Sequence, residues 1–278
     1  MKKIKLTLIF ILITISFQAQ KISGKILDEN NNPISEVRIG IENEEIGDVT
    51  NSDGNYIIDL TNIDENKNVK VLGYEYDLLI IKISDFIKSK NYNIILKKKI
   101  IQLETVVINS KKYVHKNFGT TNSTKPYGTF DSNDPNDINR EIAIKIKNKK
   151  KLKIKSININ IVEYKIEKAA TFIFDIQGDK NGFPDDKQSL INEPLKLTVT
   201  ESNIKNKKVS LNIIDKNIWI DKDFYVTVRI AEDFKGELTY AGNIFAFSKD
   251  TYYRSYFGEW KKFSAGEPSI NVDVMIEK

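Results

Sequence analysis

The fold is decided by KISGKILDENNNPISEVRIGIENEEIGDVTNSDGNYIIDL, residues 21–60. Apolar and polar residues alternate in three short runs of this stretch, around Ile22–Ile26, Val37–Ile41 and Tyr56–Leu60. Period-two alternation is typical of half-buried strands. Asn-Asn-Asn-Pro at 30–33 and Asn-Ser-Asp-Gly at 51–54 separate the runs, and these residue types favour turns. The stretch therefore predicts the beginning of an all-β domain.

The same residues carry a family resemblance. The pattern G-K-I-x-D-x(4)-P-I-x-x-V-x-I from Gly24, followed by T-N-S-D-G-N-Y-x-I from Thr50, resembles the carboxypeptidase-regulatory-like domain. That domain is a small transthyretin-like (prealbumin-like) β-sandwich found in many bacterial envelope proteins. The resemblance covers residues 21–108 and includes the step Leu72-Gly73-Tyr74-Glu75. It implies a sandwich of about seven strands and an envelope location, and it names no ligand.

The first 20 residues predict a signal peptide. A basic start, Met1-Lys2-Lys3-Ile4-Lys5, precedes the apolar run Leu6 to Phe17 and then Gln18-Ala19-Gln20. The apolar run is shorter than the roughly 20 residues that span a bilayer, so cleavage is favoured over a retained anchor. We expect the mature chain in the periplasm, at the outer membrane surface or outside the cell. The sequence has no Cys, which excludes disulfides and thiolate chemistry.

Charge and composition exclude some classes of partner. The signal segment carries three of the 43 Lys and Arg and none of the 38 acids, so the remaining chain has a net charge of +2. Such a balance does not favour nucleic acid, which needs a concentrated positive footprint. No transmembrane span is expected after signal removal.

A second all-β domain is predicted over residues 140–278, after a polar linker at 109–139. Short alternating runs recur from Ile142 to Ile276, which favours a larger sandwich of jelly-roll type. The phase of the alternation slips before Ile157, which indicates a bulge or a strand that changes sheets. The blocks at 179–184 and 252–256 resemble, less closely, the jelly-roll modules of the same exported proteins.

The residue inventory argues against a zinc peptidase. A metallocarboxypeptidase needs two His and a Glu around its zinc, and His115 is the single His of the chain. The polar neighbours of His115 favour a solvated linker residue over a catalytic one. We therefore expect no metal and no cofactor, and a protein that is not an enzyme, because the accessory domain is present without the peptidase.

Two polar segments each allow two interpretations. Asp179, Asn181 and Asp185 around Gly182 half meet a calcium-loop signature, but Asn-Gly also makes an ordinary turn, which we favour. The densest basic run has Lys at positions 145, 147, 149, 150, 151, 153 and 155. It predicts a solvated face or a Lys-guarded edge strand, with contact to acidic glycan or lipopolysaccharide as the alternative.

The candidate ligand site is an aromatic cluster. Tyr252, Tyr253, Arg254 and Trp260 lie within nine residues, where alternation is broken. Exposed rings with a nearby Arg can receive a sugar or a protein partner. Aromatic residues also seal the open end of a sandwich, and this is the alternative.

The sequence thus predicts an exported, non-catalytic binding or scaffolding protein of the cell envelope that recognises a glycan or an envelope protein. One alternative is a carbohydrate hydrolase with paired carboxylates in the second domain, about 5 to 10 Å apart. A purely structural spacer is the other.

Overall fold

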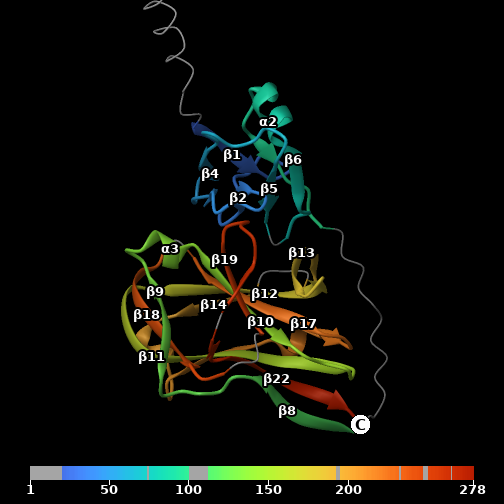
Figure 1. Ribbon diagram of the computed structural model, residues 1–278, viewed down its shortest axis with the longest axis vertical. Helices are drawn as coiled ribbons and strands as arrows, with labels where there is room; N and C mark the ends of the chain where they lie inside the picture. Colours follow the sequence, from blue (N-terminus) through green and yellow to red (C-terminus); the bar gives the residue numbers. More distant parts are fainter. Residues whose placement is uncertain are drawn as a thin grey trace, which may run out of the picture.

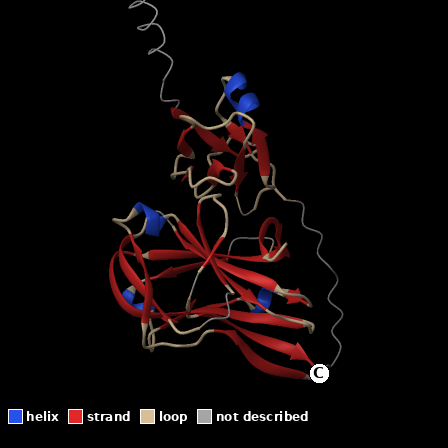
Figure 2. Cartoon of the chain, viewed as in Figure 1, coloured by secondary structure: helices blue, strands red, loops and turns tan. Residues whose placement is uncertain are grey.

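The computed structural model describes residues 21–73, 75–99, 112–191, 195–231, 233–246, 250–263 and 265–278. The predicted signal peptide, residues 1–20, lies outside this range. Strands dominate the described chain and form two sandwiches stacked along its long axis (Figures 1 and 2), which confirms the all-β prediction. Among the described residues, no helix has the length and apolar character that crossing a bilayer demands.

The first sandwich has two small sheets. Ile22 and Ile26 of one sheet face Ile39 and Ile41 of the other in a closed apolar core, as the alternation predicts. The smaller sheet has the order β4 (Asn55–Asp59), β1 (Lys21–Leu27), β7 (Ile94–Ile95). The larger has the order β3 (Gly47–Val49), β2 (Arg38–Ile41), β5 (Asn68–Leu72), β6 (Leu79–Lys82). Helix α2 (Ile83–Ser89) buries Ile83 and Phe86 against this core.

The second sandwich is larger and its two sheets enclose a long apolar core that includes Phe172, Phe174 and Ile157. One sheet has the order β13 (Phe183–Ser189), β12 (Ala170–Lys180), β17 (Phe224–Ile230), β10 (Arg140–Ile146), β19 (Thr251–Ser255), β20 (Lys261–Lys262), with β14 (Leu195–Val199) beside β12.

The facing sheet has the order β21 (Glu267–Pro268), β18 (Lys235–Asn243), β11 (Leu152–Lys168), β22 (Ile270–Glu277), β8 (Tyr113–Gly119). Strands β15 (Lys208–Asn212) and β16 (Trp219–Ile220) pair with β11, and β9 (Pro126–Asp131) pairs with β18. Three short helical segments, α3 (Pro135–Ile138), η2 (Glu201–Asn203) and η3 (Ile214–Lys216), connect strands. The register of β11 against β22 shifts between Ile154 and Ser156, which confirms the predicted slip.

The predicted linker at 109–139 is wrong for its described part. Strand β8 pairs with β22 from Tyr113↔Glu277 to Gly119↔Asn271, and β9 pairs with β18 from Asp131↔Glu237. Both strands lie at the margin of the sheet, where main-chain hydrogen bonds hold a strand that presents few apolar side chains. Among the described side chains of this segment, only Phe130 is fully buried in the core. The apolar pattern was therefore too weak to predict strands here.

Candidate functional site

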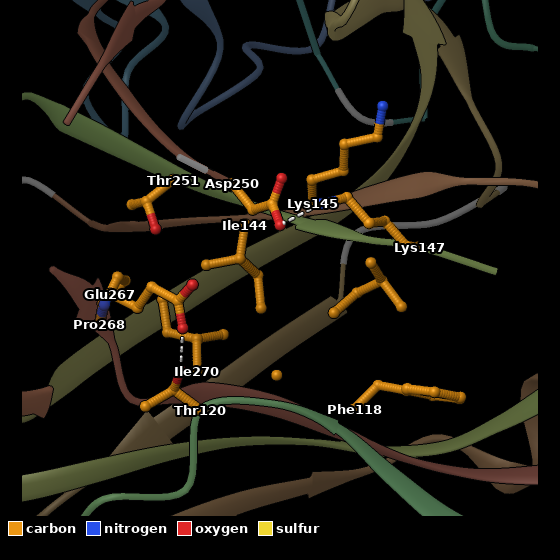
Figure 3. Close-up of a pocket in the computed structure, with 12 residues that line it drawn as sticks. Phe118, Thr120, Ile144, Lys145, Lys147, Asp250, Thr251, Glu267, Pro268 and Ile270 are labelled. Carbon is orange, nitrogen blue, oxygen red and sulfur yellow. Dashed lines mark hydrogen bonds and ion pairs between the residues drawn. The ribbon is translucent and has the colours of Figure 1, made fainter. Parts of the chain in front are cut away.

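A cavity of about 270 Å³ opens between the two sheets of the second sandwich (Figure 3). Its walls come from β10 and the start of β19 on one sheet, and from β8, β21 and β22 on the other. Its apolar lining is provided by Phe118, Ile144, Ile146, Pro268 and Ile270. An apolar cavity with a few polar groups that converge on it is the usual form of a small-molecule site.

Four polar side chains of the lining form two pairs. Lys147 Nζ lies 2.7 Å from Asp250 Oδ2, and Thr120 Oγ1 donates to Glu267 Oε2 over 2.6 Å (Figure 3). Two carboxylates, a cation and a hydroxyl thus face one small volume.

Two further side chains of the lining behave differently. Lys145 extends away from the cavity (Figure 3), and its Nζ lies 2.9 Å from Asp179 and 3.4 Å from Asp223. Thr251 is 1% exposed, and its Oγ1 has no hydrogen-bond partner among the described residues. An unpaired buried hydroxyl costs about 1–3 kcal/mol, and buried polar groups in native folds are almost always paired. The hydroxyl of Thr251 is therefore buried behind the cavity wall, out of reach of the cavity itself.

A second cluster of charges lies at the seam between the sandwiches. Arg38 Nη1 from β2 donates to Glu141 Oε2 of β10 over 2.6 Å, and Arg254 Nη2 of β19 lies 2.7 Å from the same oxygen. Arg254 also makes a bidentate pair with Asp186, at 3.0 and 2.6 Å. Lys70 Nζ of β5 lies 3.6 Å from Asp186. The side chains of the two arginines and two acids are no more than 6% exposed.

Electrostatics hold both acids of the seam in the ionised form. Burial alone would raise the pKa of Glu141, but the guanidinium groups of Arg254 and Arg38 outweigh it, and its pKa lies below the usual value. Burial likewise opposes ionisation of Asp186, yet Arg254 dominates and its pKa is held far below the usual range. Lys70 is also paired with Glu42, at 3.1 Å, so three cations and three acids balance.

Aromatic and glycine residues close the seam. The loop after β19 reaches the first sandwich (Figure 1), and Phe257 in this loop is 1% exposed. The Arg38 Cζ atom lies 5.0 Å from the centroid of the Phe257 ring, within cation–π range. A Cβ atom on Gly47 would lie 2.8 Å from the ring of Tyr256, so only glycine permits this approach.

The four predicted ligand residues do not form one platform. Consecutive strand residues point to opposite faces, so Tyr252 and Arg254 lie on the outer face of β19 and Tyr253 lies on the inner face. Tyr252 is buried against Tyr225, and Arg254 is buried in the seam. The half-buried Trp260 stacks under Arg254, whose Cζ lies 4.2 Å from the ring centroid. These positions favour the sealing role over the ligand role.

The other residues singled out in the sequence have simple structural roles. His115 is exposed on β8, 3.3 Å from Lys155 Nζ, and no group of three metal-ligating side chains occurs in the described chain. Asn181 and Gly182 take positive φ angles of 55° and 84° in the β12–β13 hairpin, which is the turn we favoured.

The lysines of the basic run lie on one face of the strand, as the first of the two interpretations predicted. In β11 Leu152 and Ile154 are buried, while Lys153 and Lys155 face the opposite side of the strand. Strand β11 is paired on both sides, so the Lys-guarded edge strand does not apply to it.

Sequence reasoning missed the residues that the structure brings together. Glu141 alternates out of phase with Ile142 and Ile144, which marks it only as facing away from the core. Its partners Arg38 and Arg254 lie 103 and 113 residues away in the chain. No local pattern links such distant positions, and the same holds for Asp250 and Thr120 of the cavity.

A known protein family matches the first domain of the chain. Residues 22–108 match the CarboxypepD_reg-like domain family, which confirms the resemblance of that part. No curated protein matches the chain.

The similarity to solved structures is weak. One is the cysteine protease and lectin-like domains of Cwp84, a surface-layer-associated protein of Clostridium difficile, with 14% identity and a TM-score of 0.38. That alignment covers 50% of this chain and 33% of the other, so this chain spans about a third of that structure. Another is a variant of the clostridial cysteine protease Cwp84 after propeptide cleavage, with 11% identity, coverage of 94% and 71%, and a TM-score of 0.42. The major pilin subunit BcpA of Bacillus cereus has 8% identity, coverage of 90% and 69%, and a TM-score of 0.18. At these scores none of the three carries an argument about function.

Proposed function

We propose that the chain is an exported, non-catalytic binding or scaffolding protein of the bacterial cell envelope, in which the first sandwich is a rigid extension of the second. The observation that carries the rigid extension is the buried charge network at the seam, with Glu141 ion-paired to an arginine from each sandwich. Interfaces between domains of one chain are usually polar and permit relative motion. Separation of the two sandwiches would break the 2.6 Å pair between Arg38 and Glu141 and would leave Arg254 alone to compensate both Glu141 and Asp186 in the second sandwich.

The compartment follows from the sequence of the first 20 residues and from the match of residues 22–108 to a domain typical of envelope proteins. Amino-terminal sequencing of the native protein after cell fractionation tests this part. We expect a mature chain that begins near Gln20 in an envelope or extracellular fraction. An intact Met1 chain in the cytosol would contradict export.

Nuclear magnetic relaxation of backbone amides tests the rigid extension. A rigid body gives both sandwiches the same rotational correlation time, whereas a flexible joint gives the smaller first sandwich a shorter one. Phe257→Ala removes the ring that fills the seam, and we expect it to separate the two correlation times. Phe245→Ala is the matched control, because Phe245 is 66% exposed and lies outside the seam. Different correlation times in the wild-type protein would end the proposal.

The hydrolase alternative has one specific observation in its favour, since Asp250 and Glu267 line the same cavity. A glycosidase needs one carboxyl that donates a proton and a second that acts as nucleophile or base. In this cavity Asp250 already accepts a hydrogen bond from Lys147, and Glu267 accepts one from Thr120. Release of reducing sugar from envelope glycans by the wild-type protein, and its loss in Glu267→Gln, would establish the hydrolase in place of the binding protein.

A further inference from the structure

The outer face of the sheet that contains β8, β11 and β22 carries aromatic and basic side chains that neither the seam nor the cavity uses. We propose that this face binds an acidic polysaccharide, whose sugar rings pack on Tyr113 and Trp219 and whose carboxylates pair with Lys151, Lys153 and Lys155. The inference deepens the binding part of the proposed function and rests on it, and it is independent of the rigid seam.

Strand register brings one row of side chains to this outer face. Trp219 of β16 pairs with Lys153 of β11. Lys153 in turn pairs with Met275 of β22, which pairs with His115 of β8. Paired residues of neighbouring strands share a face, and Ile276, next to Met275, is buried in the core. The whole row therefore points outward.

Two aromatic rings lie beside this row. Tyr113 precedes His115 by two residues, so it points to the same side of β8. Its ring centroid lies 6.1 Å from that of Trp219, although β22 and β11 separate the strands that carry the two rings. Both rings are partly exposed, and the described core of the second sandwich includes neither. Partly exposed Tyr and Trp rings are suited to a ligand with an apolar face, which the C–H groups of a sugar ring provide.

Three lysines surround the rings. Lys151 Nζ lies 5.6 Å from the centroid of the Trp219 ring, within cation–π range. Lys153 is the direct neighbour of Trp219 in the row. Lys155 Nζ lies 3.3 Å from Nδ1 of the exposed His115, which places this third ammonium group on the same outer face.

The balance of charge on this face favours an anion. Lys147 of the same basic run is paired with Asp250 at 2.7 Å, but no described acid lies within ion-pair distance of the three lysines beside the rings. Glu277, which pairs with Tyr113, is the one acid that the described strands place in these rows. Three cations therefore face one carboxylate, and an incoming acidic group is attracted. The second interpretation of the basic run, contact with acidic glycan, thus gains the support of the rings.

Short polar side chains extend the face along the strands. Asp273 accepts hydrogen bonds from Asn117, Ser156 and Asn158, and Asn271 accepts from the same two asparagines. This network forms a polar floor next to the rings. Along β22, the row of the rings and the far end of the network are about 20 Å apart, at about 3.4 Å per residue. A surface of this length suits a chain of several sugars better than a single sugar.

The position of the face also favours a polysaccharide over a lipid surface. The first sandwich contacts the other sheet, through β10 and β19, while β8 and β22 lie on the far side of the second sandwich (Figure 1). Among the described residues, none of the large exposed apolar side chains lies in the two rows. Attachment to a bilayer surface needs such side chains to enter the lipid.

The test uses the full chain and two forms of one probe, the hexamer of galacturonic acid and its methyl ester, which keeps the sugar rings and removes the charge. Backbone amide NMR shifts report where each form binds. We expect the acidic hexamer to shift amides of β8, β16 and the beginning of β11, and the ester to bind about tenfold more weakly. Binding of the acidic form should weaken as salt rises from about 10 mM to about 150 mM, because exposed ion pairs are screened. The acidic dimer should bind more weakly than the hexamer.

Lys153→Gln is the decisive variant, because it removes one charge from the centre of the row. We expect about two- to fivefold weaker binding of the acidic hexamer, the value of one exposed ion pair, and unchanged binding of the ester. Lys25→Gln, at an exposed lysine on β1 of the first sandwich, is the matched control. It loses the same net charge and should bind like wild type.

Trp219→Ala separates the rings from the charges. We expect it to weaken binding of both forms of the hexamer, by about tenfold or more. Its melting temperature is measured alongside, and Lys153→Gln carries the test if this variant does not fold.

Several results would overturn the inference: no shift with the acidic hexamer, equal binding of the ester, shifts confined to other faces, or wild-type binding by Lys153→Gln. Tighter binding of an oligodeoxynucleotide of equal charge, or of phosphatidylglycerol vesicles, would assign the face to another class of partner and overturn it as well. Amino-terminal sequencing and the two correlation times judge the proposed function separately, so its failure is distinguishable from a failure at this face.

Discussion

Arg38 and Glu141 are 103 residues apart in the chain and 2.6 Å apart in the fold, and this contact joins the two sandwiches. The same carboxylate oxygen also receives Arg254 Nε over 2.8 Å, and its second oxygen accepts from Thr227 Oγ1 over 3.0 Å. Glu141 is therefore the central acid of the seam. Its removal leaves two buried guanidinium groups facing each other with less compensation.

The first prediction follows from this geometry. Glu141→Gln keeps the shape and removes the charge, and we expect a loss of about 3–5 kcal/mol in the free energy of unfolding, the usual cost of breaking a buried ion pair. Chemical denaturation followed by circular dichroism measures the loss. Glu45→Gln is the control, because Glu45 pairs with Lys261 across the same seam but is 52% exposed. An exposed pair is worth about 0–1 kcal/mol. Equal effects of the two substitutions would show that the seam does not depend on buried charge.

The second prediction concerns acid. The pKa values of Glu141 and Asp186 are lowered in the fold, against about 4.3 and 3.9 in an unfolded chain. Their contribution to stability is therefore complete above about pH 4.5 and is lost as the pH falls below that value. Calorimetry between pH 7 and pH 3 should show a melting temperature that drops below about pH 4. Glu141→Gln should show a smaller drop, and an identical drop would assign the acid sensitivity to other groups.

The third prediction concerns Asp175, whose pKa is shifted in the opposite direction. Burial raises the pKa of Asp175, despite hydrogen bonds from Gln177 Nε2 and Ser189 Oγ. A raised pKa in a folded acid means that stability falls as the pH rises from about 4 through the folded value. Asp175→Asn removes this penalty, and the carbonyl of Gln177, which has no partner among the described residues, can accept from the new amide after rotation. We expect an equal or higher melting temperature at pH 7, by up to a few degrees.

Asp185→Asn, at a neighbouring acid of β13 that accepts from Lys187 N, is the control for Asp175→Asn. A clear fall in the melting temperature of Asp175→Asn at pH 7 would mean that the carboxylate is used in its ionised form.

The sequence predicted the sandwiches because strand alternation is local. Ile22 with Ile26, and Phe172 with Phe174, each mark one face of one strand, and burial followed that phase. Strands β8 and β9 were missed because a marginal strand is held by main-chain pairing, which leaves little trace in side-chain type. The predicted ligand residues do not share one face for a related reason. Nearness in sequence grouped Tyr252, Tyr253 and Arg254, while the pleat of β19 sends the middle residue to the other face.

The fourth prediction concerns Trp260. Trp260→Ala removes the ring on which Arg254 stacks, and we expect a loss of about 1–2 kcal/mol in stability, the value of a desolvated cation–π contact. Trp260→Phe keeps a ring and should retain most of that stability. Binding to envelope glycans, measured per folded molecule, should be unchanged in both variants. Weaker binding with an unchanged melting temperature would restore Trp260 to the ligand site.

The fifth prediction places the beginning of the second folding unit. Strand β8 covers one margin of its sheet through β22, and β9 pairs with β18, so a fragment of residues 140–278 would lack two strands of that sheet. The loss of β8 would expose unpaired backbone groups of β22. The loss of β9 would remove Phe130, whose ring centroid lies 5.9 Å from that of Phe172 and 5.3 Å from that of Tyr240, and would uncover these two rings. A fragment of residues 112–278 retains both strands. We expect the longer fragment to give a dispersed amide NMR spectrum and the shorter one to aggregate or remain unfolded. A well-folded 140–278 fragment would show that β8 and β9 are dispensable and that the boundary at residue 140 is the physical one.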